Sequence, residues 1–198
     1  MSKLKIKIMK NIATILILII CISCKAQTTI SIDEAATYRK TAEGIPESVQ
    51  FVKDTQNKLQ QFVGTWKGSY DGKQYEITLE KKENYGNYSI KWDKLIGRML
   101  VKDNSGNIIY NSMNKADYDT FFWGDTFQYR TYVMSFVGNY DCLESGDVFI
   151  ETLPNKPNQM TLYYSQDKDG LITSPSQCPN FSTFISLLPK DKMTLTKQ

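Results

Sequence analysis

The sequence predicts a mainly β protein: a single antiparallel up-and-down β-barrel preceded by one short N-terminal helix. Apolar and polar residues alternate with a period of two after residue 66, which is typical of strands with one buried face. Turn-forming residues separate these stretches at short intervals, which favours a sandwich or barrel. Twelve Tyr, nine Phe and three Trp also favour strands, and 198 residues suit one domain.

The first 23 residues are typical of a secretory signal peptide. Four lysines precede an apolar run at residues 12–20, and Ser23 and Cys24 follow it. A transmembrane helix is the alternative, but it needs about 20 apolar residues and this run is shorter. Removing the four lysines leaves 20 basic and 21 acidic residues, so the mature charge is near −1. That balance argues against nucleic acid as a partner, because phosphate binding needs a basic surface.

The end of the apolar run resembles a bacterial lipobox, in which a small residue precedes a cysteine that receives lipid. Ser23 and Cys24 fit this pattern, whereas Cys21 stands where Leu is usual. The resemblance implies lipidation at Cys24, including palmitate, and membrane attachment through more than one acyl chain. Lys25, where some lipoproteins have Asp, implies the outer membrane, and we expect the periplasmic face. The alternative is simple cleavage with Cys24 unmodified.

The region between this cysteine and the barrel divides into two predicted parts. Residues 24–45 are polar with little periodicity, which predicts a lipidated N-terminus and a tether. Residues 46–61 begin with Pro46, and apolar residues then recur every three or four positions, which predicts an amphipathic helix. Residues 46–198 would therefore form the folded domain, a helix followed by the barrel.

The predicted strands follow the alternation. Tyr75, Ile77 and Leu79 mark one strand after the hairpin signal Asp71-Gly72. Further strands are expected at residues 87–93, 96–102, 108–112, 129–137, 148–153, 160–165, 183–188 and 193–196.

The segment Gly64-Thr65-Trp66 resembles the Gly-x-Trp motif that begins the first strand of lipocalins (calycins). In that family the Trp packs across the closed end of an eight-stranded barrel, beneath a basic residue from near the C-terminus. The resemblance implies a lipocalin-like barrel with Gly64 and Trp66 in structural roles. It also implies a cation–π contact from Lys192 or Lys197 to the indole.

The arrangement is also similar to a family of small bacterial lipoproteins of unassigned function. That resemblance implies a location and a fold, but no activity. The matching segments are Asp93-Lys94-Leu95-Ile96-Gly97, Leu188-Pro189 and Met193-Thr194-Leu195.

The chain has no histidine, which excludes Ser-His-Asp and Cys-His catalysis and any His-ligated metal site. Cys142 and Cys178 are the other cysteines of the mature domain, and an exported domain favours a disulfide between them. Two free buried thiols are the alternative.

An aromatic cluster surrounds residues 124–125 and is the candidate ligand site. In a barrel it would line a mouth and bind a small apolar or sugar-like ligand, although plain core packing is the alternative. The candidate residues are Tyr118, Phe122, Trp123, Tyr129 and Tyr132, and neighbouring Phe121 and Phe127 extend the cluster.

Acidic residues provide weaker candidates. Residues 165–170 resemble half of a calcium loop, but Ser176 stands where a bidentate Glu is needed, so a polar hairpin turn is the preferred interpretation. Close carboxylates of the kind that a glycosidase pairs across its substrate are interpreted as solvated loop acids. They are Asp117, Asp119, Asp141, Glu144 and Asp147.

Two functions remain in view. The first is a lipid-anchored envelope module that binds a small ligand, and the second is a structural or protein-interaction lipoprotein whose barrel is filled by its own side chains. A hydrolase comes last, so we expect no enzymatic activity, no metal and no cofactor.

Overall fold

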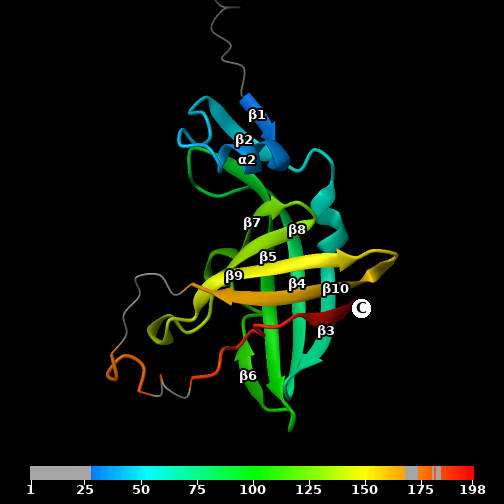
Figure 1. Cartoon of the computed structure of the whole chain (residues 1–198), viewed down its shortest axis with the longest axis vertical. Helices are drawn as coiled ribbons and strands as arrows, with labels where there is room; N and C mark the ends of the chain where they lie inside the picture. Colours follow the sequence, from blue (N-terminus) through cyan, green and yellow to red (C-terminus); the bar gives the residue numbers. More distant parts are fainter. Residues whose placement is uncertain (1–27, 168–173, 180, 182–183) are drawn as a thin grey trace, which may run out of the picture.

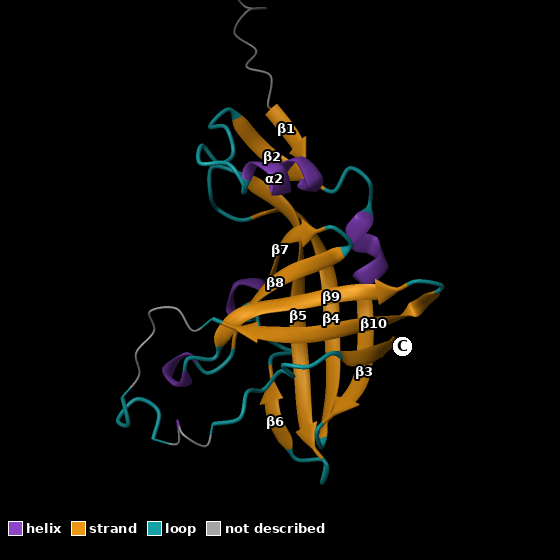
Figure 2. Ribbon diagram, viewed as in Figure 1, coloured by secondary structure: helices purple, strands orange, loops and turns teal. Residues whose placement is uncertain are grey.

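The computed structural model describes residues 28–167, 174–179, 181 and 184–198. Cys24 and the predicted signal peptide lie outside the described residues. Strands make up most of the described chain, with one short α-helix and three 3₁₀ turns (Figures 1 and 2). In chain order the elements are β1 (Thr28–Ser31), α2 (Ile32–Tyr38), β2 (Val49–Lys53), η1 (Lys58–Phe62), β3 (Gly64–Tyr70), β4 (Lys73–Tyr85), β5 (Lys91–Asp103), β6 (Ile108–Asn111), η2 (Asp117–Asp119), β7 (Phe122–Gln128), β8 (Thr131–Val137), η3 (Tyr140–Cys142), β9 (Ser145–Leu153), β10 (Lys156–Gln166) and β11 (Met193–Lys197).

Eight of the strands form a closed antiparallel barrel, which confirms the predicted fold class. The strand order is β5-β4-β3-β11-β10-β9-β8-β7, and β7 returns to β5 through the pair Ile96 and Trp123. Strands that are adjacent in the barrel also follow one another along the chain, with two exceptions. β3 pairs with β11, and β6 comes between β5 and β7 in the sequence but pairs with β5. In Figure 1, β3, β4 and β5 run along the long axis while β9 and β10 cross them.

β5 is the strand that organises the rest. One edge pairs with β4 over most of its length. The other edge meets three partners in succession: β2 at Lys91 and Trp92, β7 at Ile96, and β6 from Leu100 to Lys102. The surface between β2 and β7 therefore opens beside the middle of β5.

The helix predicted over residues 46–61 is wrong. Residues 49–53 form β2, which pairs in parallel with β1 on one side and with β5 on the other, and η1 follows. Val49 and Val52 are buried at the three-residue spacing that mimicked a helix. β-branched residues suit a strand, and pairing on both edges satisfies the backbone groups that a helix would have satisfied internally.

The predicted tether is also wrong from Thr28 onward, because β1 and α2 occupy this region. The Ser31 hydroxyl caps α2 by accepting a hydrogen bond from the Glu34 amide at 3.0 Å, and Asp33 and Glu34 lie in the first turn. Ile32 and Ala35 are buried. The Ser-x-x-Glu pattern at residues 31–34 is a helix-start signal that was overlooked.

Three strand predictions need correction. Residues 86–90 form the β4–β5 turn rather than part of a strand, and Tyr88 is exposed there. Residues 184–188 are irregular, and residues 182–183 lie outside the described part of the chain. β7 was missed, because its aromatic residues were interpreted as a cluster around a turn. The calcium-like segment begins at the end of β10 and runs into residues that are not described.

Candidate functional site

Trp66 closes one end of the barrel as the lipocalin resemblance implied. Its indole is fully buried, its Nε1–H donates to the Phe62 carbonyl at 2.7 Å, and the Lys197 ammonium lies 5.2 Å from the ring centroid. Gly64 has a φ of 130°, and a Cβ atom there would come within 2.8 Å of the Lys197 side chain. The glycine therefore permits the lysine to lie over the indole.

Side chains fill the barrel between its two ends. Phe122, Tyr132, Phe136 and Tyr164 are all at most 1% exposed. Phe136 meets Phe122 and Tyr164 edge to face, with ring centroids 5.7 and 6.1 Å apart. Phe122 and Tyr132, two of the predicted ligand residues, thus belong to the core.

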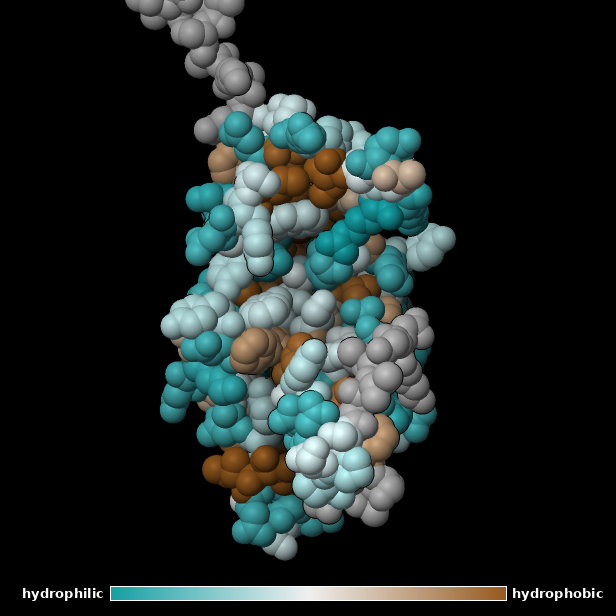
Figure 3. Space-filling view, turned by 90° about the vertical axis from the view of Figure 1, so that its left-hand side faces the viewer, coloured by the Kyte–Doolittle hydropathy of each residue, from teal (hydrophilic) through white to brown (hydrophobic). Residues whose placement is uncertain are grey.

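An extensive groove lies on the outer wall of the barrel, beside the middle of β5. Its volume is about 1130 Å³. The β4–β5 turn forms one wall, and η2 and the start of β7 form another, while Arg39 at the end of α2 closes it above. Figure 3 views the side of the molecule that is on the left in Figure 1, where separate brown hydrophobic areas lie among pale and teal surface. The aromatic lining residues are Tyr85, Tyr88, Trp92, Tyr118 and Trp123.

Strand alternation explains why Trp92 and Lys94 face the groove. Asp93 and Leu95 point to the buried side of β5, so their neighbours point outward. Trp92 lies opposite Tyr85 on β4, and Lys94 lies opposite Lys82. Burial lowers the pKa of Lys94 from its ordinary value, while the nearby Asp125 carboxylate partly offsets this effect.

Ion pairs occupy most other charges of the groove. Arg39 forms a two-pronged pair with Asp125 and lies over the Trp92 ring at 5.7 Å. Asp117 accepts from Arg98 at 2.5 Å and from Lys82 at 3.2 Å. By contrast, no hydrogen bond or ion pair within the described structure engages the Lys94 ammonium.

Trp123 is held in place from the adjacent 3₁₀ turn. Its Nε1–H donates to the Asp117 carbonyl at 2.9 Å, and its ring contacts Phe121 with centroids 5.5 Å apart. The Asp117 side-chain carboxylate also accepts a hydrogen bond from Arg98 on β5, so these contacts join η2 to both β7 and β5. Trp123 is therefore held at both its indole N–H and its ring face.

Residues 9–123 match the sequence family described as "Family of unknown function (DUF6705)", which covers more than half of the chain. The chain belongs to the DUF6705 family. No curated protein and no solved structure matched the chain. The region shared with the DUF6705 family contains the apolar run, Cys24 and every groove residue named above except Asp125.

In this DUF6705 protein, the five predicted ligand residues lie in three different places. Tyr118 and Trp123 line the groove, Phe122 and Tyr132 lie in the core, and Tyr129 is 96% exposed on the β7–β8 turn. The prediction missed Arg39, Tyr85, Tyr88, Trp92 and Lys94, which also line the groove. Outward alternation on β5 was the available signal for Trp92 and Lys94.

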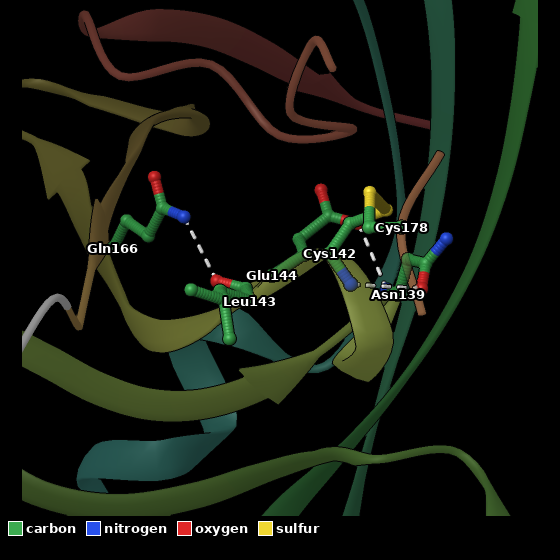
Figure 4. Close-up of a disulfide and its surroundings, with 6 residues drawn as sticks. All are labelled: Asn139, Cys142, Leu143, Glu144, Gln166 and Cys178. Carbon is green, nitrogen blue, oxygen red and sulfur yellow. Dashed lines mark hydrogen bonds between the residues drawn. A yellow bond between two sulfur atoms is a disulfide. The ribbon is translucent and has the colours of Figure 1, made fainter. Parts of the chain in front are cut away.

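Residues 184–189 form a covering segment that packs against the opposite end of the barrel, where Tyr75 donates a hydrogen bond to the Leu187 carbonyl at 2.9 Å. Cys142 and Cys178 form a disulfide with Cα atoms 5.1 Å apart, next to the contact from the Gln166 amide to the Leu143 carbonyl at 2.8 Å (Figure 4). The buried Glu144 carboxylate accepts hydrogen bonds from the backbone amide of Leu187 and the hydroxyl of Ser186. Leu187 and Leu188 then fill the barrel mouth.

The acidic candidates have structural partners or lie apart. Glu144 anchors the covering segment and Asp117 is paired with two cations, whereas Asp147 lies on β9. No cluster of three or more potential metal-ligating side chains occurs among the residues that the structure describes. In that same part of the chain, no helix has the length and apolar character required to span a membrane.

Proposed function

We propose that this DUF6705 protein is a lipid-anchored envelope protein that binds a glycan in the groove on its outer wall. The observation that carries this proposal is the groove itself, in which five Tyr and Trp side chains line an open channel of about 1130 Å³. Flat aromatic faces with polar edges suit sugar rings, whose faces are apolar and whose hydroxyls form hydrogen bonds. An open channel suits a short stretch of a longer polymer.

The filled barrel supports a ligand site outside it. A ligand in the interior would have to displace fully buried residues such as Tyr132 and Tyr164, at a cost of several kcal/mol. Binding rather than catalysis is proposed because the chain has no histidine and two groove acids, Asp117 and Asp125, are held in ion pairs.

The proposed anchor is lipid on Cys24, with the domain at the outer membrane and facing the periplasm. The apolar run and the Ser23–Cys24 pair support this proposal, and both lie in the region shared with the family. Only three residues separate Cys24 from β1. The Cα atom of Cys24 therefore lies at most about 14 Å from that of Thr28, the first residue of β1. The end bearing β1, β2 and α2 would therefore lie close to the membrane.

The second candidate is an interaction lipoprotein that binds another envelope protein. The filled interior favours it, because a barrel without an internal cavity can serve as a rigid scaffold. In that case the groove would hold a protein segment instead of a sugar chain.

The test is a screen of neutral and acidic oligosaccharides against the full-length protein in detergent micelles, followed by titration calorimetry. Tyr88→Ala removes a groove aromatic that is 85% exposed, so its loss leaves the fold intact. We expect a loss of affinity of about 2–10-fold. The matched control is Tyr129→Ala, which removes a similarly exposed tyrosine, at 96%, outside the groove. Absence of glycan binding, or equal losses in both variants, would overturn the proposal.

A further inference from the structure

The segment Asp93–Gly97 lies in the middle of β5, and its pattern stood out in the sequence. Asp93 is buried and accepts hydrogen bonds from the Asp54 and Asn84 amides at 3.2 and 3.0 Å. It also pairs with Lys53 at 3.2 Å, so it ties β2 and the end of β4 to β5. This first residue of the segment has a structural role.

Three more residues of the segment are also explained by the fold. Leu95 is fully buried in the core, and Ile96 pairs with Trp123 where the barrel closes. A Cβ atom at Gly97 would lie 2.3 Å from the Phe122 ring, so only glycine leaves room for that core side chain. Packing thus accounts for four of the five positions.

Lys94 is the residue that packing does not explain. It points into the groove, burial lowers its pKa, and within the described structure its ammonium has no ion-pair partner. The charged groups that face it are engaged elsewhere: Arg39 with Asp125, and Lys82 with Asp117. Lys94 is only partly buried, but a cation that has lost part of its hydration is stabilised when a ligand supplies the opposite charge.

The net charge of the groove points the same way. Its lining includes five basic and three acidic residues, although the mature chain carries almost no net charge. Trp92 precedes Lys94 by two positions on the same face, about 7 Å away along the strand. Trp123 lies opposite Ile96, two positions beyond Lys94. Along this wall of the groove, Lys94 therefore occupies a position between those of Trp92 and Trp123.

We propose that Lys94 binds the carboxylate of a uronic-acid unit, so that the ligand is an acidic glycan. Trp92 and Trp123 would stack on sugar rings on either side of the charged unit. This inference rests on the proposed glycan-binding function. It adds that the glycan is negatively charged and that Lys94 recognises this charge. A carboxylate and an ammonium form a charge-assisted hydrogen bond, which is stronger than a hydrogen bond between neutral groups.

The test compares one sugar chain with and without its charge. The probes are a hexamer of galacturonic acid and the same hexamer with every carboxylate methyl-esterified, each titrated into the full-length protein in detergent micelles. Wild type should bind the acid at least about tenfold more tightly than the ester. Lys94→Met keeps the length and apolar character of the side chain, and it should bind both forms equally, at the affinity that wild type has for the ester. Lys156→Met, at the exposed start of β10, is the matched control and should keep the preference.

The outcomes separate the role of Lys94 from the glycan-binding function beneath it. If neither hexamer nor any neutral glycan binds, the glycan-binding function itself fails. If both hexamers bind equally to wild type, or if Lys94→Met keeps the preference, the glycan function stands and the role of Lys94 is refuted. Binding to vesicles that contain anionic lipid, if lost in Lys94→Met while hexamer binding is unchanged, would also overturn the inference in favour of a lipid headgroup.

Discussion

Replacing Trp66 by alanine should destabilise the barrel far more than the same replacement at Trp123. The Trp66 indole is fully buried, and a side chain of this size removes about 150–250 Å² from water. At about 25 cal/mol per Å² this corresponds to about 4–6 kcal/mol, close to the 3–5 kcal/mol typical of such truncations. The mutation also leaves the Phe62 carbonyl without its buried donor. We therefore expect a loss of about 4 kcal/mol, a large part of the usual 5–15 kcal/mol for a domain.

The contrast with Trp123 makes the prediction specific. Trp123 is half-buried on the outer wall, so Trp123→Ala should cost only about 1–2 kcal/mol. The assay is equilibrium urea unfolding of wild type and both variants, followed by circular dichroism. With a slope of about 2 kcal/mol per M, Trp66→Ala should lower the midpoint by about 2 M. If the Trp123 variant loses as much stability as the Trp66 variant, or more, then Trp66 does not close the barrel.

A further measurement separates the parts of this effect. Trp66→Phe keeps most of the apolar area but removes the indole N–H, so it should cost about 1–3 kcal/mol. Lys197→Met removes the cation above the ring and should cost about 0.5–2 kcal/mol. A Lys197→Met variant as stable as wild type would mean that the lysine lies over the indole without stabilising it.

Other predictions test the anchor, the covering segment and the groove. A palmitate analogue should label wild type in its host and fail to label Cys24→Ala; equal labelling would refute the lipid anchor. Peptide maps with and without reductant should differ by the Cys142–Cys178 pair, and full alkylation of both thiols in unreduced protein would contradict this. Reduction should lower the free energy of unfolding by about 4 kcal/mol, because the disulfide joins residues that are 36 positions apart. Glu144→Gln should destabilise the fold by about 2–3 kcal/mol in urea unfolding, because a weaker acceptor remains for the amide of Leu187; an unchanged midpoint would contradict this. Affinity for oligogalacturonate should be retained while Lys94 is protonated. The affinity should fall as the pH rises through the pKa of Lys94, which is lowered from the ordinary 10.5. If Lys94→Met shows the same fall, another group is responsible for the pH dependence.

The barrel was accessible from the sequence because its signals are local. Tyr75, Ile77 and Leu79 alternate with polar residues, and all three are buried on β4. The Gly64–Trp66 motif and a basic residue near the C-terminus also predicted a contact that joins the two ends of the barrel sequence. Periodicity and short motifs report which face of a strand is buried, and that was sufficient for the fold class.

The N-terminal unit of β1, α2 and β2 and the groove both depend on contacts that local patterns do not report. β2 is a strand because β1 and β5 pair with both of its edges, and no pattern within residues 49–53 specifies those partners. Trp92 and Trp123 are far apart in sequence and come together only because Ile96 pairs with Trp123 when the barrel closes. The groove is a product of that closure, so sequence alone could name two of its aromatic residues but not the site.

The parallel pairing of β1 with β2, and of β2 with β5, has a mechanical consequence. If the protein is held at Cys24 while a polymer pulls on the groove, tension enters along β1 and leaves through β5. The hydrogen bonds between parallel strands lie across that line of force, so they bear the load together in shear. Single-molecule extension between Cys24 and a covalent handle at the C-terminal end of β5 should therefore show one concerted rupture of β1 and β2 from β5. Stepwise unzipping would contradict this load path.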